Sequence, residues 1–85
     1  MKGYAVLLNP ESPTSILELL SDYIRERGSF SFVFCDSVEP HGGYVELELV
    51  REERDPWKVS IPYSCVLAIC DASGPKGEFG FLSNK

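Results

Sequence analysis

The sequence predicts an α+β domain in which one N-terminal helix packs on a strongly bent, mostly antiparallel sheet of the small-barrel type. Three observations predict this class. One amphipathic helical pattern occupies residues 14–27. The runs that follow it alternate apolar and polar residues, and most of the links between them are too short for a parallel crossover. A stretch interrupted by a proline, Trp57–Asp71, predicts a corner where the sheet changes direction.

Length and charge limit the possible functions. The chain has 85 residues, so we expect a single domain spanning residues 1–85. Its formal net charge is −5, which disfavours binding to nucleic acid or to an anionic membrane, since both need clustered Lys and Arg. No apolar run approaches the ~20 residues of a spanning helix, and no signal peptide is recognisable. We therefore expect a cytoplasmic protein.

The first two elements are a short strand and the helix. The apolar run Tyr4–Leu8 predicts the strand. Ser12 is a candidate helix N-cap with Pro13 at the first helical position, and Gly28 suits the position just after a helix end. The helix is expected over residues 14–27. Its apolar residues recur at three- and four-residue spacing and form one stripe: Ile16, Leu19, Leu20, Tyr23 and Ile24.

Two strands are expected after the helix. In Phe30–Cys35 the phenylalanines fall on one face. Residues 36–43 read as a loop whose Gly42–Gly43 pair supplies the positive φ of a hairpin turn. The clearest amphipathic strand is Tyr44–Val50. Its inward residues are Val45, Leu47 and Leu49, and its outward residues are Tyr44, Glu46 and Glu48.

The corner comes next, after a charged tip at residues 51–56. Residues 57–61 predict a half-buried strand, and residues 62–64 a tight turn or one 3₁₀ turn. Residues 65–70 are apolar at every position, which predicts a strand covered on both faces. A turn at residues 73–77 and a last strand at residues 78–82 complete the chain. The corner residues expected in the core are Val59, Ile61, Val66 and Ile69.

The sequence contains no recognisable catalytic signature. Catalysis through Cys35 and His41 would need a hydrogen bond between them and a third group that orients the imidazole. His41 with Asp36 or Glu39 is a weak metal-binding pattern, and we expect a solvated loop histidine instead. An odd set of three cysteines favours reduced, apolar side chains over a disulfide framework. The sequence thus predicts a protein that is not an enzyme and has no cofactor and no metal.

Aromatic side chains suggest a binding surface. One helix cannot cover both faces of a sheet, so some of the many Phe and Tyr residues should line an exposed groove. Such grooves and open strand edges accept extended peptides by strand addition. The same surface could instead form the seam of a homodimer. The candidate partner-binding residues are Phe32, Phe34, Tyr44, Glu46, Glu48 and Tyr63.

The run VSIPYSCVLAI at Val59–Ile69 resembles the corner strand pair of stringent starvation protein B, the SspB family of ClpXP protease adaptors. The strand Tyr44–Val50, and the helix at 14–27 followed by residues 30–36, also resemble elements of that family. The resemblance implies a peptide-groove fold, dimeric through its helix, that recognises an unstructured peptide such as a degradation tag. The family's extra strands, acidic linker and unfoldase-docking segment have no counterpart here, so it implies peptide binding without delivery.

Two functions are therefore expected from different classes. The first is an SspB-like peptide- or protein-binding module without catalytic activity. The alternative is a small acidic interaction or inhibitor protein, of the phage or mobile-element type, that binds a host protein. Its acidic residues would be Glu46, Glu48, Glu52 and Glu53. In both cases the partner is a protein or an extended peptide.

Overall fold

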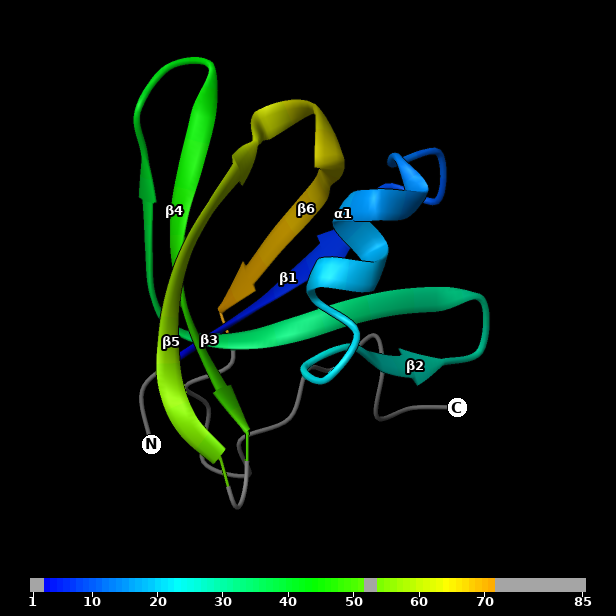
Figure 1. Cartoon of the computed structure of the whole chain (residues 1–85), viewed down its shortest axis with the longest axis horizontal. Coiled ribbons are helices and arrows are strands. Elements are labelled where there is room, and N and C mark those ends of the chain that lie inside the picture. Colours follow the sequence, from blue (N-terminus) through cyan, green and yellow to red (C-terminus); the bar gives the residue numbers. More distant parts are fainter. Residues whose placement is uncertain (1–2, 52–53, 72–85) are drawn as a thin grey trace.

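The computed structural model describes residues 3–51 and 54–71. In this part of the chain, six strands form one antiparallel sheet with the order β5-β4-β3-β1-β6, and β2 pairs with β3 beside that path (Figure 1). The strands are β1 (Tyr4–Leu8), β2 (Arg25–Arg27), β3 (Phe30–Pro40), β4 (Tyr44–Arg51), β5 (Arg54–Pro62) and β6 (Val66–Asp71). The helical elements are α1 (Thr14–Leu19) and the 3₁₀ turn η1 (Tyr63–Cys65).

The expected fold class is wrong because the helix is much shorter than predicted. α1 has six residues instead of spanning residues 14–27, so the described chain is mostly antiparallel sheet and not a helix on a sheet. After Leu20 the chain turns, with the N–H groups of Tyr23 and Ile24 both donating to the Leu20 carbonyl. Arg25–Arg27 then pairs with the start of β3 as β2. This sheet pairing replaces the last helical turns that the spacing predicted.

The helix-end signals serve other local structures. Gly28 has φ +60° and lies in the turn between β2 and β3, not after a helix. Ser12 does not cap α1: its hydroxyl donates to the Asn9 carbonyl at 2.7 Å, and Pro13 takes the N-cap position. α1, the only α-helix among the described residues, has six residues, and no described helix is long and apolar enough to cross a membrane.

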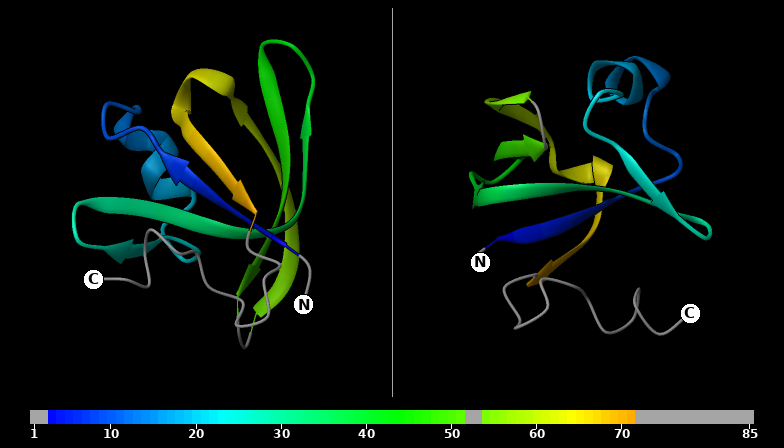
Figure 2. Two further views of the ribbon diagram at one scale, coloured as in Figure 1. Left: turned by 180° about the vertical axis from the view of Figure 1, so that it is seen from behind. Right: turned by 90° about the horizontal axis from the view of Figure 1, so that it is seen from below.

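The main core lies on the face of the sheet that α1 covers (Figure 2). Leu20 comes directly after α1 and is fully buried there. The buried residues come from four strands, η1 and the turn after α1, because alternate positions of each strand face inward. They are Val6, Leu8, Leu20, Val33, Cys35, Val45, Leu47, Leu49, Ile61 and Cys65. The predicted inward face of Tyr44–Val50 is thereby confirmed.

A smaller apolar cluster lies on the opposite face of β1, β3 and β6. Ala5, Leu7 and Phe32 are buried in it, and Phe34, Ala68 and Cys70 pack against them. The sheet therefore carries apolar side chains on both faces where β1 is its central strand. This is why β1 reads as a continuous apolar run with no alternation.

A bulge in β3 bends the sheet. Cys35 pairs with Leu49 and Ser37 pairs with Glu48, so Asp36 is an extra residue between two ladder positions. The first half of β3 pairs with β1 and β2, and the second half with β4. The loop predicted at residues 36–43 is thus wrong over most of its length: the strand continues to Pro40, and residues 41–43 alone form the hairpin turn.

The corner is confirmed and its burial is partly corrected. Pro62 ends β5, η1 follows, and β6 returns along β1. Ile61 is 1% exposed, but Ile69 is 37% exposed and is not a core residue. β6 lies at the end of the described sheet and alternates in exposure, so it is not covered on both faces as predicted. Val59 and Val66 are half-buried beside the main core. The turn and strand predicted at residues 73–82 lie outside the described residues.

Candidate functional site at the β3–β4 hairpin and the β6 edge

The structure separates the six predicted binding residues into two groups. Phe32 and Phe34 lie on β3 opposite Leu7 and Ala5 of β1. Their rings meet edge to face with centroids 5.3 Å apart, and the Arg25 guanidinium lies 5.1 Å from the centre of the Phe34 ring. Phe32 is buried and Phe34 half-buried in the smaller cluster. Both therefore contribute to the packing of the smaller cluster.

The two tyrosines lie at the other end of the sheet. Tyr44 pairs with Pro62 across β4 and β5, and Tyr63 follows Pro62 directly. The Tyr63 N–H donates to the Gly43 carbonyl at 3.0 Å, which ties η1 to the hairpin turn. Tyr44 is 47% exposed and its ring stacks on that of His41, with centroids 5.1 Å apart and planes 17° apart. This end of the molecule presents aromatic surface to solvent, and Tyr44 points outward as its place in the strand predicted.

Glu46 and Glu48 lie on one face of β4, as predicted, and have different neighbours. Glu48 faces Lys58 of β5 and Ser37 of β3. Glu46 faces Glu39 of β3, and its Oε1 lies 3.5 Å from Nε2 of His41. Both glutamates are half-buried, so the strand face is less exposed than an isolated hairpin would be.

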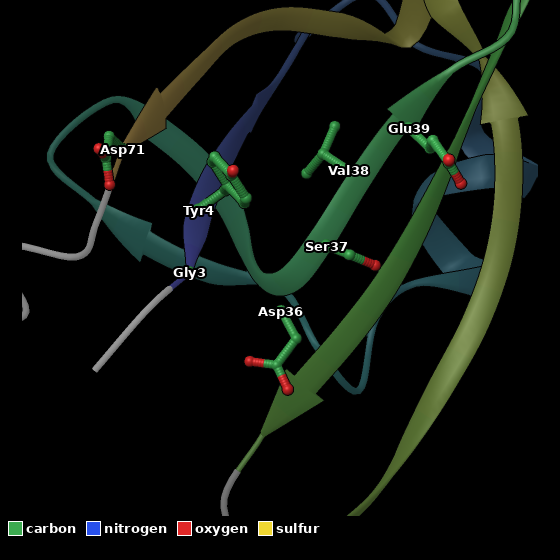
Figure 3. Close-up of a pocket in the computed structure, with 7 residues that line it drawn as sticks. All are labelled: Gly3, Tyr4, Asp36, Ser37, Val38, Glu39 and Asp71. Atoms are coloured by element: carbon green, nitrogen blue, oxygen red, sulfur yellow. The ribbon is translucent and has the colours of Figure 1, made fainter.

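An acidic hollow lies in the angle between the end of β6 and the second half of β3 (Figure 3). Its volume is about 480 Å³. Three carboxylates and one phenol line it, and the described lining contains no Lys or Arg. The bulge at Asp36 creates it, because the bend swings the second half of β3 away from β1. The lining residues are Gly3, Tyr4, Asp36, Ser37, Val38, Glu39 and Asp71.

Sequence reasoning missed this hollow. Its acids come from two strands that are far apart in the chain, and Asp36 and Glu39 lie in the segment that was predicted to be a loop. The one available signal was the acidic pair Asp36 and Glu39 around a small polar residue, Ser37, after an apolar strand. That pattern alone does not place Asp71 beside them.

Cys35 is unsuited to be a nucleophile in this fold. Burial, together with the carboxylate of Asp36, raises the pKa of the Cys35 thiol from 9.0 to about 12. The reactive form of a cysteine is the thiolate, which is therefore suppressed at neutral pH. Cys35 packs in the main core, whereas His41 contacts Tyr44 and Glu46 at the hairpin end. The described structure does not bring the two together as a catalytic pair.

The edge strand β6 adjoins the acidic hollow. Among residues 3–51 and 54–71, it pairs with β1 and with no second strand. Leu67 is 55% exposed and Ile69 is 37% exposed. No charge or proline interrupts the strand before Asp71, which ends it at the hollow. The opposite edge strand, β5, contains Pro56 and Lys58, residue types that block further pairing.

Comparison with protein-family models, curated proteins and solved structures gives no match for this chain. The geometry of the hollow, the hairpin and the β6 edge is therefore the basis for assigning a function.

Proposed function

We propose that this chain is a non-catalytic binding module that pairs an extended peptide with β6 and holds a basic side chain of that peptide in the acidic hollow. One observation carries the proposal. An uncharged edge strand with exposed Leu67 and Ile69 ends at Asp71, in a hollow that Asp36 and Glu39 also line.

The edge supplies affinity that does not depend on sequence. A peptide that adds to an open edge makes main-chain hydrogen bonds, and alternate side chains face one side of the sheet. Natural proteins protect edges with proline, lysine or bulges, as β5 does with Pro56 and Lys58. Between Val66 and Cys70, β6 contains no proline and no lysine, and its ladder with β1 is irregular only at Leu67, which is an extra residue between Val66 and Ala68. Among the described residues, an apolar edge without proline or lysine, in a sheet whose opposite edge has both, favours a partner at β6.

The hollow supplies selectivity by charge. Asp36, Glu39 and Asp71 contribute negative charge at one end of the edge, on a chain whose formal net charge is −5. A Lys or Arg of the peptide fits this field better than a neutral or acidic residue. Because the hollow is open to water, the charge contribution should weaken as salt is added.

A second candidate is a small acidic protein that binds a folded host protein. The acidic surface of β3 and β4, with Glu39, Glu46 and Glu48 on one face, favours this reading. The two candidates differ in what is bound: a short peptide suffices for the first, and a folded surface is needed for the second. A degradation tag is the narrower form of the first candidate, suggested by the resemblance of the corner to SspB.

Fluorescence anisotropy with labelled ten-residue peptides tests the proposal. The probes are alternating Val-Thr sequences with Lys at the N-terminal end, Lys at the C-terminal end, or Glu at either end. We expect saturable binding of one Lys peptide, and which end carries the Lys reports whether the added strand is antiparallel or parallel to β6. The Glu peptides should bind more weakly, by a margin that shrinks with salt. An SspB-type tag peptide is measured in the same way.

Variants locate the bound strand. Ile69→Lys places a charge on the β6 edge and should abolish binding. The matched control is Leu19→Lys, because Leu19 is also a large, exposed apolar residue (49% exposed) but lies on α1. Equal binding by the two variants would disprove the β6 site. If no peptide binds and light scattering shows a dimer that Ile69→Lys dissociates, the edge is occupied by a second copy and not by a peptide.

A further inference from the structure

We propose that Glu39, His41 and Glu46 form a binding site for Zn²⁺ on the β3–β4 hairpin. The site lies away from the β6 strand but shares Glu39 with the acidic hollow, and the evidence for it does not depend on peptide binding. One nitrogen and two carboxylate oxygens, one from each residue, lie within 4.8 Å of one another.

The strand pairing puts two like charges face to face. Glu39 and Glu46 are directly opposite in the β3–β4 ladder, so their side chains emerge on the same face about 5 Å apart. Like charges in that position destabilise a strand pair. The neighbouring pair Glu48 and Lys58 shows the ordinary arrangement, in which opposite charges face each other. A cation between Glu39 and Glu46 would offset the repulsion.

The turn fixes the imidazole beside these carboxylates. The His41 N–H donates to the Tyr44 carbonyl at 2.8 Å and closes the hairpin, and Gly42 adopts φ +80°. The His41 ring stacks on Tyr44, and Tyr63 anchors the turn through the Gly43 carbonyl. These contacts limit the rotation of the His41 ring, so part of the entropy cost of ordering this side chain is met before a metal binds.

The distances suit ligands of one ion better than hydrogen bonds. His41 Nε2 lies 3.5 Å from Oε1 of Glu46 and 4.0 Å from Oε1 of Glu39. Hydrogen bonds between such atoms are about 2.7–3.2 Å long. Ligand atoms about 2.1 Å from a tetrahedral zinc ion are roughly 3.4 Å apart. Small side-chain rotations would bring all three atoms to that spacing, with water as the fourth ligand.

The donor set selects the metal. An imidazole with two carboxylates suits Zn²⁺ and neighbouring transition metals, whereas Mg²⁺ and Ca²⁺ prefer oxygen ligands alone. Three protein ligands and a water are the composition of an open zinc site. All three residues remain accessible at the surface of the hairpin, so an ion can enter without rearrangement of the fold.

Isothermal titration with Zn²⁺, alongside visible absorption with Co²⁺, tests the site on the full chain. We expect one high-affinity equivalent, and no comparable binding of Mg²⁺. His41→Ala and Glu46→Gln should each weaken binding at least about tenfold, since loss of outer-shell partners alone costs 10–100-fold. The matched control is Glu48→Gln, on the same face of the same strand, which should bind like the parent.

Two further measurements keep the outcome decisive. Circular dichroism establishes that each variant is folded, and Zn²⁺ should raise the melting temperature of the parent and of Glu48→Gln but not of His41→Ala. An intense thiolate-to-Co²⁺ absorption band that Cys70→Ser removes would place the ion on a cysteine and overturn the proposal. Equal affinities for His41→Ala and the parent, or no measurable Zn²⁺ binding, would also overturn it.

Discussion

Replacing Ile61 or Ile69 with alanine gives the sharpest test of how the corner packs. The two residues lie on consecutive strands of one uncharged stretch, and sequence reasoning predicted both to be core. The structure separates them: Ile61 is 1% exposed and pairs with Val45 in the main core, whereas Ile69 is 37% exposed on the edge strand. The same substitution should therefore have unequal effects at the two positions.

The magnitudes follow from the buried area. Isoleucine to alanine removes three carbon atoms, worth roughly 2.4 kcal/mol of transfer free energy when fully buried. At Ile61 a cavity adds to this, and we expect a loss of about 3–4 kcal/mol. At Ile69, 37% of the residue is already exposed to water and no closed cavity forms, so we expect a loss of about 1.5 kcal/mol. A domain of 85 residues has about 4–13 kcal/mol of stability to lose.

Thermal melts and urea titrations of both variants measure the difference. At about 4–8 °C per kcal/mol for a domain of this size, Ile61→Ala should lower the melting temperature by about 12–32 °C and Ile69→Ala by about 6–12 °C. Equal falls in melting temperature for the two variants would mean that β6 is covered on the side where Ile69 lies. A larger loss for Ile69→Ala would refute the assignment of the strand faces.

Two other predictions concern Cys35 and the hairpin turn. Because burial raises the pKa of Cys35 from 9.0 to about 12, the unfolded chain loses this proton first, and stability should fall as pH rises from 9 towards 12 by up to about 1.4 kcal/mol per pH unit. Urea titrations at pH 8 and 10 should show that Cys35→Ala reduces this slope, and an unchanged slope would contradict the burial. Gly42→Ala should lower the free energy of unfolding by about 1 kcal/mol, because Gly42 has φ +80°. Gly43 has no positive φ, and a Cβ there meets open space, so Gly43→Ala should change the free energy of unfolding by less than about 0.5 kcal/mol. Thermal melts of the two glycine variants compare them directly, and equal melting temperatures would disprove the strain argument.

The strands could be predicted because alternation is a local property. Tyr44–Val50 alternates so regularly that its inward and outward faces follow from the sequence, and the structure confirms the inward residues. The corner was also predictable, since Pro62 ends the ladder whatever its neighbours are. The burial of Val66–Cys70 was not, because burial depends on whether a further strand or layer covers β6, and no local pattern reports that.

The helix shows how a correct pattern can support a wrong element. Four of the five residues of the predicted stripe, Ile16, Leu20, Tyr23 and Ile24, do face the main core, whereas the fifth, Leu19, is 49% exposed. A six-residue helix followed by turns places these side chains in the core just as a helix of four turns would. Gly28 likewise needs a positive φ in either a helix end or a hairpin turn, so its presence did not distinguish the two. Pairing of β2 with β3 decided between them, and this pairing is a tertiary contact.

The candidate site was predictable only in part. Tyr44, Glu46 and Tyr63 were named from the sequence and do lie at the hairpin end of the sheet. Phe32 and Phe34 were named for the same surface and pack elsewhere, because the smaller cluster gives β3 a second apolar face. The acidic hollow depends on a one-residue bulge, and a bulge has no reliable signature in one sequence.

The pairing of β1 with β6 has a consequence for the route by which the chain folds. β3, β4 and β5 follow one another closely in the sequence and can associate soon after the chain begins to collapse, whereas β1 must also find β6, at the far end of the described chain. The chain must lose the conformational entropy of closing this long loop before the contacts between β1 and β6 stabilise it. We therefore expect the β1–β6 seam to form after the rate-limiting barrier, so that weakening it accelerates unfolding and leaves the folding rate almost unchanged. The lifetime of the folded protein, more than its speed of formation, would then be set at this seam.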